Sequence, residues 1–152
     1  MTVSYDEELK RSGRIVFTVK GISMRPLFHA DEDAIIVVKC DPEALKNLDV
    51  VLFLRPSLED IQYVLHRIVG RRKDGMYLIA GDNCISYDVV APDDILGIVT
   101  TAQRGNKPIK LSGVGYWFYE HLWCAPYRFR FFVLKTRSRI RSLGAKILRR
   151  RK

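Results

Sequence analysis

The stretch Gly21-Ile22-Ser23-Met24-Arg25-Pro26-Leu27 sets one hydroxyl between a glycine and a proline, directly after the apolar segment 15–20. That segment is rich in β-branched residues and has the length of a strand. A strand that runs into a glycine and a serine holds the Ser23 hydroxyl at a sharp corner. Ser23 is therefore either a nucleophile or part of an ordinary turn, and only a base supplied elsewhere in the chain decides between the two.

Five more apolar segments of strand length follow, separated by turn residues. Lys73-Asp74-Gly75 predicts a tight hairpin between two of them. We therefore expect a mainly β fold, with a small, coiled, antiparallel, barrel-like domain over residues 15–105 after a short segment 1–14. Within that segment, residues 4–13 are expected to form a short helix, with Ser4 as its N-cap and Gly13 as its stop. The five segments cover residues 34–39, 50–54, 63–69, 76–80 and 95–102.

The sequence changes character after Gly105, where aromatic residues are dense up to Pro126 and apolar residues then recur at helical spacing among arginines. Of the 26 Lys and Arg residues, 11 lie from position 128 onward, where there is no Asp or Glu; the first 127 residues hold 15 basic and 17 acidic ones. Residues 106–152 are therefore expected to form a C-terminal α-helical appendage, made of two helices joined at Pro126.

The basic segment 128–152 is expected to meet an anionic partner. A basic amphipathic helix beside an aromatic one is typical of an interfacial anchor, so an anionic membrane surface is the partner that we favour. A helix packed on the body is the alternative, and nucleic acid, which would attract the same charge, is the least favoured partner. The oligomeric state stays open.

Neither a metal nor a cofactor is expected. The three cysteines, Cys40, Cys84 and Cys124, are odd in number and show no C-x-x-C spacing, which argues against a disulfide framework or a zinc site. No run of about 18 or more apolar residues occurs, so no transmembrane helix is expected, and the acidic start of the chain is unlike a signal peptide.

A base for Ser23 is offered by His66, which lies in the middle of the apolar segment 63–69. A strand holds an imidazole rigidly, as a general base requires; the alternative is a half-buried histidine bonded to a carbonyl. Gly81-Asp82-Asn83 then adds carboxylates, because Asp82 and Asp88 stand six residues apart after the next strand. One of them is placed to orient the imidazole, although Gly-Asp-Asn is also a common turn.

In their order along the chain, five segments covering roughly residues 15–102 resemble the sequence boxes of the signal peptidase I superfamily. Most bacterial members carry a lysine base, whereas the endoplasmic-reticulum and archaeal types carry histidine, so His66 resembles the histidine branch. In that branch an aspartate six residues beyond the Gly-Asp aspartate completes the site, as Asp88 does here. The five segments are Gly21-Ile22-Ser23-Met24-Arg25-Pro26, Asp49-Val50-Val51, His66-Arg67-Ile68-Val69, Gly81-Asp82-Asn83 and Gly97-Ile98-Val99.

The resemblance implies a serine endopeptidase that cleaves a leader or precursor peptide from a pre-protein through an acyl-enzyme. Ser23 would be the nucleophile and His66 its base, while Asp88 would hold His66 and Asp82 would shape the loop or share that task. The Ser23 N–H is one candidate donor to the oxyanion. Some relatives add a serine two positions before the nucleophile, where this chain has Gly21, so the second donor is not identified.

Two departures from the family bear on where the protein acts. Ala30-Asp31-Glu32-Asp33 replaces the usual Gly-Asp turn, and the transmembrane helix that presents signal peptidases outside the cytoplasm is not seen. We therefore expect a cytoplasmic protein, peripheral at the cytoplasmic face of the membrane where it attaches. Two alternatives are a non-catalytic peptide-binding module of the same fold and a self-cleaving regulator like the LexA-type repressors, which use lysine as base.

Overall fold

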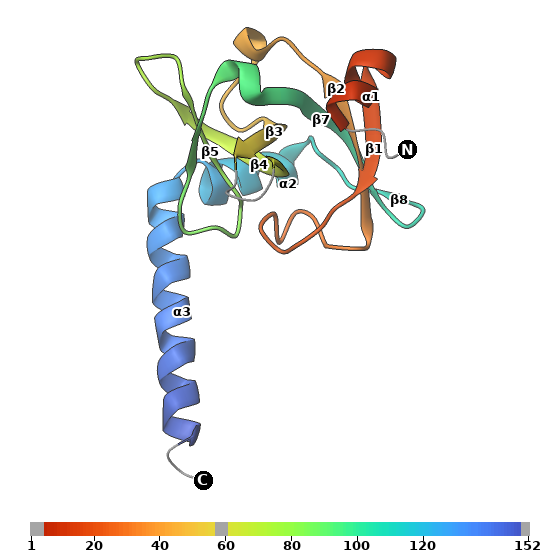
Figure 1. Cartoon of the computed structure of the whole chain (residues 1–152). Coiled ribbons are helices and arrows are strands. Elements are labelled where there is room, and N and C mark those ends of the chain that lie inside the picture. Colours follow the sequence, from red (N-terminus) through yellow and green to blue (C-terminus); the bar gives the residue numbers. More distant parts are fainter. Residues whose placement is uncertain (1–4, 57–60, 150–152) are drawn as a thin grey trace.

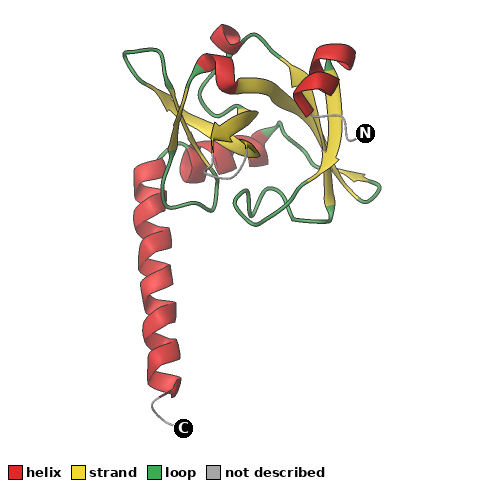
Figure 2. Cartoon of the chain, viewed as in Figure 1, coloured by secondary structure: helices red, strands yellow, loops and turns green. Residues whose placement is uncertain are grey.

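The computed structural model describes residues 5–56 and 61–149. Its centre is one antiparallel sheet of eight strands, in the order β1-β2-β7-β3-β4-β5-β6, with β8 paired to β7. Figure 1 shows the strands curving around the body, and Figure 2 separates them from the helices by colour. The strands are β1 Arg14–Thr18, β2 Asp33–Lys39, β3 Val50–Pro56, β4 Ile61–Arg71, β5 Tyr77–Ala80, β6 Asp88–Val90, β7 Ile95–Arg104 and β8 Lys107–Pro108.

The mainly β fold and all six strands expected from the sequence are confirmed, but the sheet does not close into a barrel. The reason lies in β3, which buries both of its faces. Val50 and Leu52 belong to one hydrophobic core, whereas Val51 and Phe53 belong to another. A barrel has one interior, but here the sheet carries a core on each side of its central strand, and its end strands β1 and β6 do not pair.

The helical elements are α1 Tyr5–Ser12, α2 Val114–Phe118, a π-helical segment η3 Tyr119–Cys124, and α3 Tyr127–Arg149, together with short 3₁₀ turns at Pro42–Ala44 and Pro92–Asp94. Helix α1 ends at Ser12, directly before the expected stop at Gly13; Ser4, its expected cap, lies outside the described residues. The expected break at Pro126 is confirmed, and α3 then projects away from the body (Figure 1). None of the described helices combines the length and the apolar character needed to cross a bilayer.

Candidate functional site

The Ser23 corner lies in the loop between β1 and β2 and is fixed from both sides. Gly21 has a φ of 73°, a left-handed conformation that glycine adopts without strain. Met24 is buried in the core, while Ser23 beside it stays partly exposed. From the loop after β5, the Asn83 N–H donates to the Ser23 carbonyl over 2.8 Å, and the Asn83 side chain donates to the Ile22 carbonyl over 3.2 Å. The corner is therefore tied to the loop that carries the predicted carboxylates.

The far end of the β1–β2 loop is anchored by the buried carboxylate of Asp33. Asp33, which is fully buried, accepts two hydrogen bonds from the Arg104 guanidinium, over 2.7 and 2.8 Å, and one from the His29 N–H over 2.7 Å. Although burial raises the pKa of Asp33, these hydrogen bonds outweigh burial and lower it below its ordinary value. The altered turn at 30–33 therefore still anchors the loop, through an ion pair.

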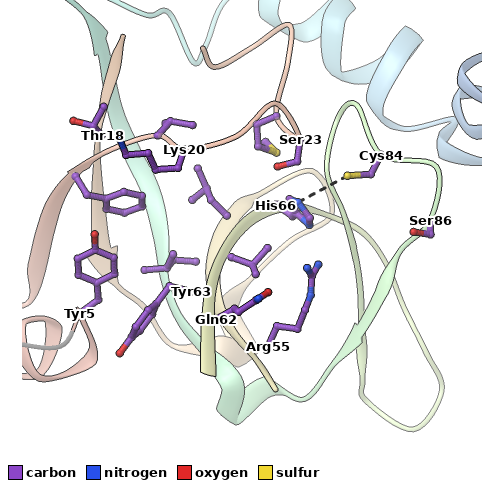
Figure 3. A pocket seen from close by; sticks show the side chains of 16 residues that line it. Tyr5, Thr18, Lys20, Ser23, Arg55, Gln62, Tyr63, His66, Cys84 and Ser86 are labelled. Carbon is purple, nitrogen blue, oxygen red and sulfur yellow. Dashed lines mark hydrogen bonds between the residues drawn. The ribbon is translucent and has the colours of Figure 1, made fainter. Parts of the chain in front are cut away.

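His66 lies on β4 with only 5% of its surface exposed, and its Nε2 atom faces the Ser23 corner. A Cβ atom added to Gly81 would stand 2.6 Å from the Ser23 carbonyl oxygen and 3.0 Å from His66 Nε2. The bare Cα of Gly81 therefore allows corner and imidazole to approach each other. Figure 3 shows both side chains at the same end of a pocket. No direct hydrogen bond joins them among the described residues, and in unliganded enzymes such contacts are often long.

Cys84 is the functional candidate that sequence reasoning missed. Its Sγ lies 4.0 Å from His66 Nε2 (dashed in Figure 3), and it lines the pocket with Ser23. The sequence shows Cys84 directly after Gly81-Asp82-Asn83, so its position beside the predicted acid is the signal that could have found it. A thiol and a hydroxyl thus lie on the same side of one imidazole.

Asp88, at the start of β6, faces the other nitrogen of the ring. Its Oδ2 lies 3.6 Å from His66 Nδ1, and the same oxygen pairs with the Arg55 guanidinium. Burial lowers the pKa of His66, but the Asp88 carboxylate and the Cys84 thiol outweigh it and raise the pKa above its ordinary value. Burial raises the pKa of Asp88, yet His66 and Arg55 lower it overall, so the carboxylate is ionised at neutral pH.

Asp82 is placed differently from Asp88. It is fully buried and accepts two parallel hydrogen bonds, both 2.9 Å long, from the equally buried Arg67. Its Oδ2 also accepts a 2.7 Å hydrogen bond from the Tyr119 hydroxyl, and Arg130 lies 3.5 Å from its Oδ1. The partners of Asp82 therefore belong to the side of β4 opposite His66 and to the helical extension. Of the two predicted carboxylates, Asp88 lies beside the imidazole of His66, whereas Asp82 forms an ion pair with Arg67.

The helical extension is attached to the sheet through this same ion pair. Arg67 donates in addition to the Tyr116 hydroxyl over 3.1 Å and to Glu120 over 3.3 Å. The Trp123 indole donates to the Asp82 carbonyl over 3.3 Å, and Arg130 donates to the Gly81 carbonyl over 3.3 Å. Side chains of α2, η3 and α3 thus support the loop that touches Ser23.

A pocket of ≈ 680 Å³ opens beside the Ser23–His66 pair. Tyr5 of α1, Phe17 of β1 and Tyr63 of β4 form an aromatic wall away from the polar end; the rings of Tyr5 and Phe17 are stacked 5.3 Å apart. Such a pocket, apolar with convergent polar groups at one end, suits a peptide side chain. Over the described residues, no three His, Cys, Asp or Glu side chains come together as metal ligands would.

Comparison of the chain with protein-family models, with curated proteins and with solved structures found no match.

Proposed function

We propose that this protein is a serine endopeptidase of the signal-peptidase-like type, acting on a leader or precursor peptide. The observation that supports it is the placement of three side chains: Ser23, from the corner after β1, and His66, from β4, line one pocket, and Asp88, from β6, lies 3.6 Å from His66 Nδ1. A nucleophile, a base and a group that orients the base are the parts that acyl transfer requires.

In the proposed reaction His66 Nε2 accepts the Ser23 proton as the hydroxyl attacks the peptide carbonyl. Asp88, ionised beside Nδ1, stabilises the imidazolium that forms. The imidazolium then protonates the leaving amine, and water hydrolyses the acyl-enzyme by the same groups in reverse order. The backbone N–H of Ser23 is the candidate donor to the oxyanion; a preorganised donor of this kind contributes roughly 3–4 kcal/mol.

Cys84 offers a second nucleophile, because its Sγ lies 4.0 Å from the same nitrogen. The test is therefore a comparison of Ser23→Ala, Cys84→Ala and His66→Ala with wild type, using a fluorophosphonate probe and a peptide library. We expect Ser23→Ala and His66→Ala to lose both labelling and cleavage while Cys84→Ala keeps labelling at Ser23. If Cys84→Ala loses cleavage while Ser23→Ala keeps it, the enzyme is a cysteine peptidase. If the wild-type protein binds peptides without cleaving them, the alternative of a non-catalytic peptide-binding module is supported instead.

We also propose that α3 docks on an anionic membrane surface. Its described part has an apolar stripe (Phe129, Phe132, Val133 and Ile140), in which Phe129, Phe132 and Ile140 are 63%, 66% and 64% exposed. Helical spacing places basic residues on both flanks of this stripe, with Arg128, Lys135 and Arg139 on one side and Arg137 and Arg141 on the other. An exposed apolar stripe between two cationic rows matches the boundary between acyl chains and anionic headgroups.

Vesicle flotation tests this attachment. We expect the protein to float with phosphatidylglycerol-containing vesicles, to release as salt is raised and to ignore phosphatidylcholine vesicles. The triple substitution Phe129→Ser, Phe132→Ser and Ile140→Ser should abolish flotation, with circular dichroism as the check on folding. Retention of RNA with no flotation would contradict the proposal and favour nucleic acid as the anionic partner.

A further inference from the structure

A second cavity adjoins the Ser23 corner on the side of α3. It measures ≈ 830 Å³ and lies between the corner, the loop after β5 and one face of the helix. Ile22 and Arg25 come from the corner and Asn83 to Ser86 from the loop; the helix contributes Leu134, Arg137, Ser138 and Arg141. Cys84 and Ser86 also line the pocket beside His66, so the two cavities meet at that loop. We call the second cavity the basic cleft.

The charge of the basic cleft is uniform. Arg25, Arg137 and Arg141 line it, and no Asp or Glu does. All three are exposed, and within the part of the chain that the structure describes none of them forms a salt bridge. Elsewhere the same chain pairs its arginines readily, as Arg55, Arg67 and Arg104 show. Three guanidinium groups without a salt-bridge partner around one concavity suit an anionic ligand, since a guanidinium matches carboxylate and phosphate oxygens.

The rest of the lining favours a peptide over a small anion. Ile22 and Ile85 are 59% and 46% exposed and belong, with Trp123, to the wall of the basic cleft. Apolar side chains and an indole between arginines suit a ligand that is both acidic and apolar. A free inorganic anion would use the arginines and leave this apolar surface in water.

We propose that the basic cleft binds an acidic segment of the peptide substrate, next to the bond that is cut. This inference rests on the proposed peptidase function, because it is the position of Ser23 between the two cavities that makes them parts of one substrate path. One part of the substrate occupies the pocket beside His66, and the acidic part crosses the corner into the basic cleft. The substrate class is then a precursor with Asp or Glu on one side of the cleaved bond.

The test measures binding apart from cleavage. Three fluorescent 12-residue peptides share an alanine-rich core and carry four Glu at the N-terminal end, four Glu at the C-terminal end, or four Gln. On Ser23→Ala protein, fluorescence anisotropy should show one of the acidic peptides binding about tenfold more tightly than the Gln peptide. Arg137→Gln/Arg141→Gln should remove that difference. The matched control Arg128→Gln/Arg139→Gln removes the same charge from the same helix outside the cleft and should keep it.

The possible outcomes distinguish failure of the basic cleft from failure of the proposed peptidase activity. Tighter binding of an acidic peptide to the cleft, with no cleavage by wild type, supports the basic cleft and removes the peptidase. Cleavage by wild type with equal binding of all three peptides overturns the basic cleft and leaves the peptidase. If Arg137→Gln/Arg141→Gln abolishes binding to phosphatidylglycerol vesicles but leaves the acidic peptide bound as before, these arginines serve the membrane and the inference is overturned.

Discussion

Asp88 Oδ2 lies 3.6 Å from His66 Nδ1 and shares its charge with the Arg55 guanidinium. The imidazole therefore has an ionised carboxylate at one nitrogen and leaves the other, Nε2, for the Ser23 corner. Asp88 thus both faces the imidazole and raises its proton affinity, against the burial that lowers it.

Replacing that carboxylate should move the acid limb of the pH–rate profile. The Asp88 charge favours the imidazolium, so Asp88→Asn lowers the pKa of His66 and leaves Arg55 unneutralised beside it. Because the neutral imidazole is the active base, kcat/KM of the variant should persist to lower pH, while its plateau falls about 10²- to 10⁴-fold. The measurement is kcat/KM against pH. An unmoved acid limb would show that Asp88 does not act on His66.

Asp82→Asn should act on stability before chemistry. It removes the charge of the carboxylate that Arg67 meets through two hydrogen bonds and leaves only Glu120, 3.3 Å away and partly exposed, of the carboxylates described beside this buried guanidinium. We expect a cost of about 3–5 kcal/mol in the free energy of unfolding. Urea denaturation followed by tryptophan fluorescence measures the change, and Asp88→Asn is the comparison, since Asp88 is only partly buried. Unchanged stability with a large loss of kcat would instead place Asp82 in the reaction.

Gly81→Ala should separate the corner from the base. The added methyl would meet the Ser23 carbonyl oxygen at 2.6 Å and the Cys84 sulfur at 2.7 Å, so the two loops must move apart. We expect a cost of about 1–3 kcal/mol in stability together with nearly complete loss of activity. Gly75→Ala, in the distant hairpin with a φ of 87° and no atom near its added methyl, should lose stability but keep activity.

The thiols should differ in reactivity with iodoacetamide. Cys84 lines an open pocket beside His66, whereas Cys124 is fully buried, and burial together with Asp82 raises the pKa of Cys124 to about 12. Cys84 should therefore be alkylated before Cys124, and His66→Ala should slow it by removing the nearby base. Peptide mass mapping over time follows each site. Faster labelling of Cys124 would mean that the extension opens readily.

The strands could be predicted because each is a β-branched segment between turn residues, and the helices because of Gly13 and Pro126. Strand β6 was missed since it has three residues and only its pairing with β5 makes it a strand. Closure of the sheet into a barrel was wrongly expected. The burial of both faces of β3 depends on what packs against each face, which the local sequence pattern does not show.

In the site, Ser23, His66 and Asp88 were predicted from their order along the chain, and the structure places Asp88 beside His66 and His66 beside the Ser23 corner. The partner of Asp82 was not visible in the sequence, because Arg67 comes 15 residues earlier and is brought beside it by the pairing of β4 with β5. Cys84 was missed for a related reason, since the sequence does not show which ring nitrogen the loop places it against.

His66 and Arg67 are neighbours on β4 whose side chains leave opposite faces of the strand, one toward the pocket and one toward the helical extension. A chain shortened at residue 105 would keep every proposed catalytic group but strip Tyr116, Tyr119 and Arg130 from the Arg67–Asp82 pair. The Arg67–Asp82 pair would then be exposed to water, and the loop after β5, which binds the Ser23 carbonyl, would lose its contacts with Trp123 and Arg130. Residue 105, where the sequence changes character, is therefore a poor place to divide the protein, because the sheet and the helical extension both depend on the Arg67–Asp82 ion pair.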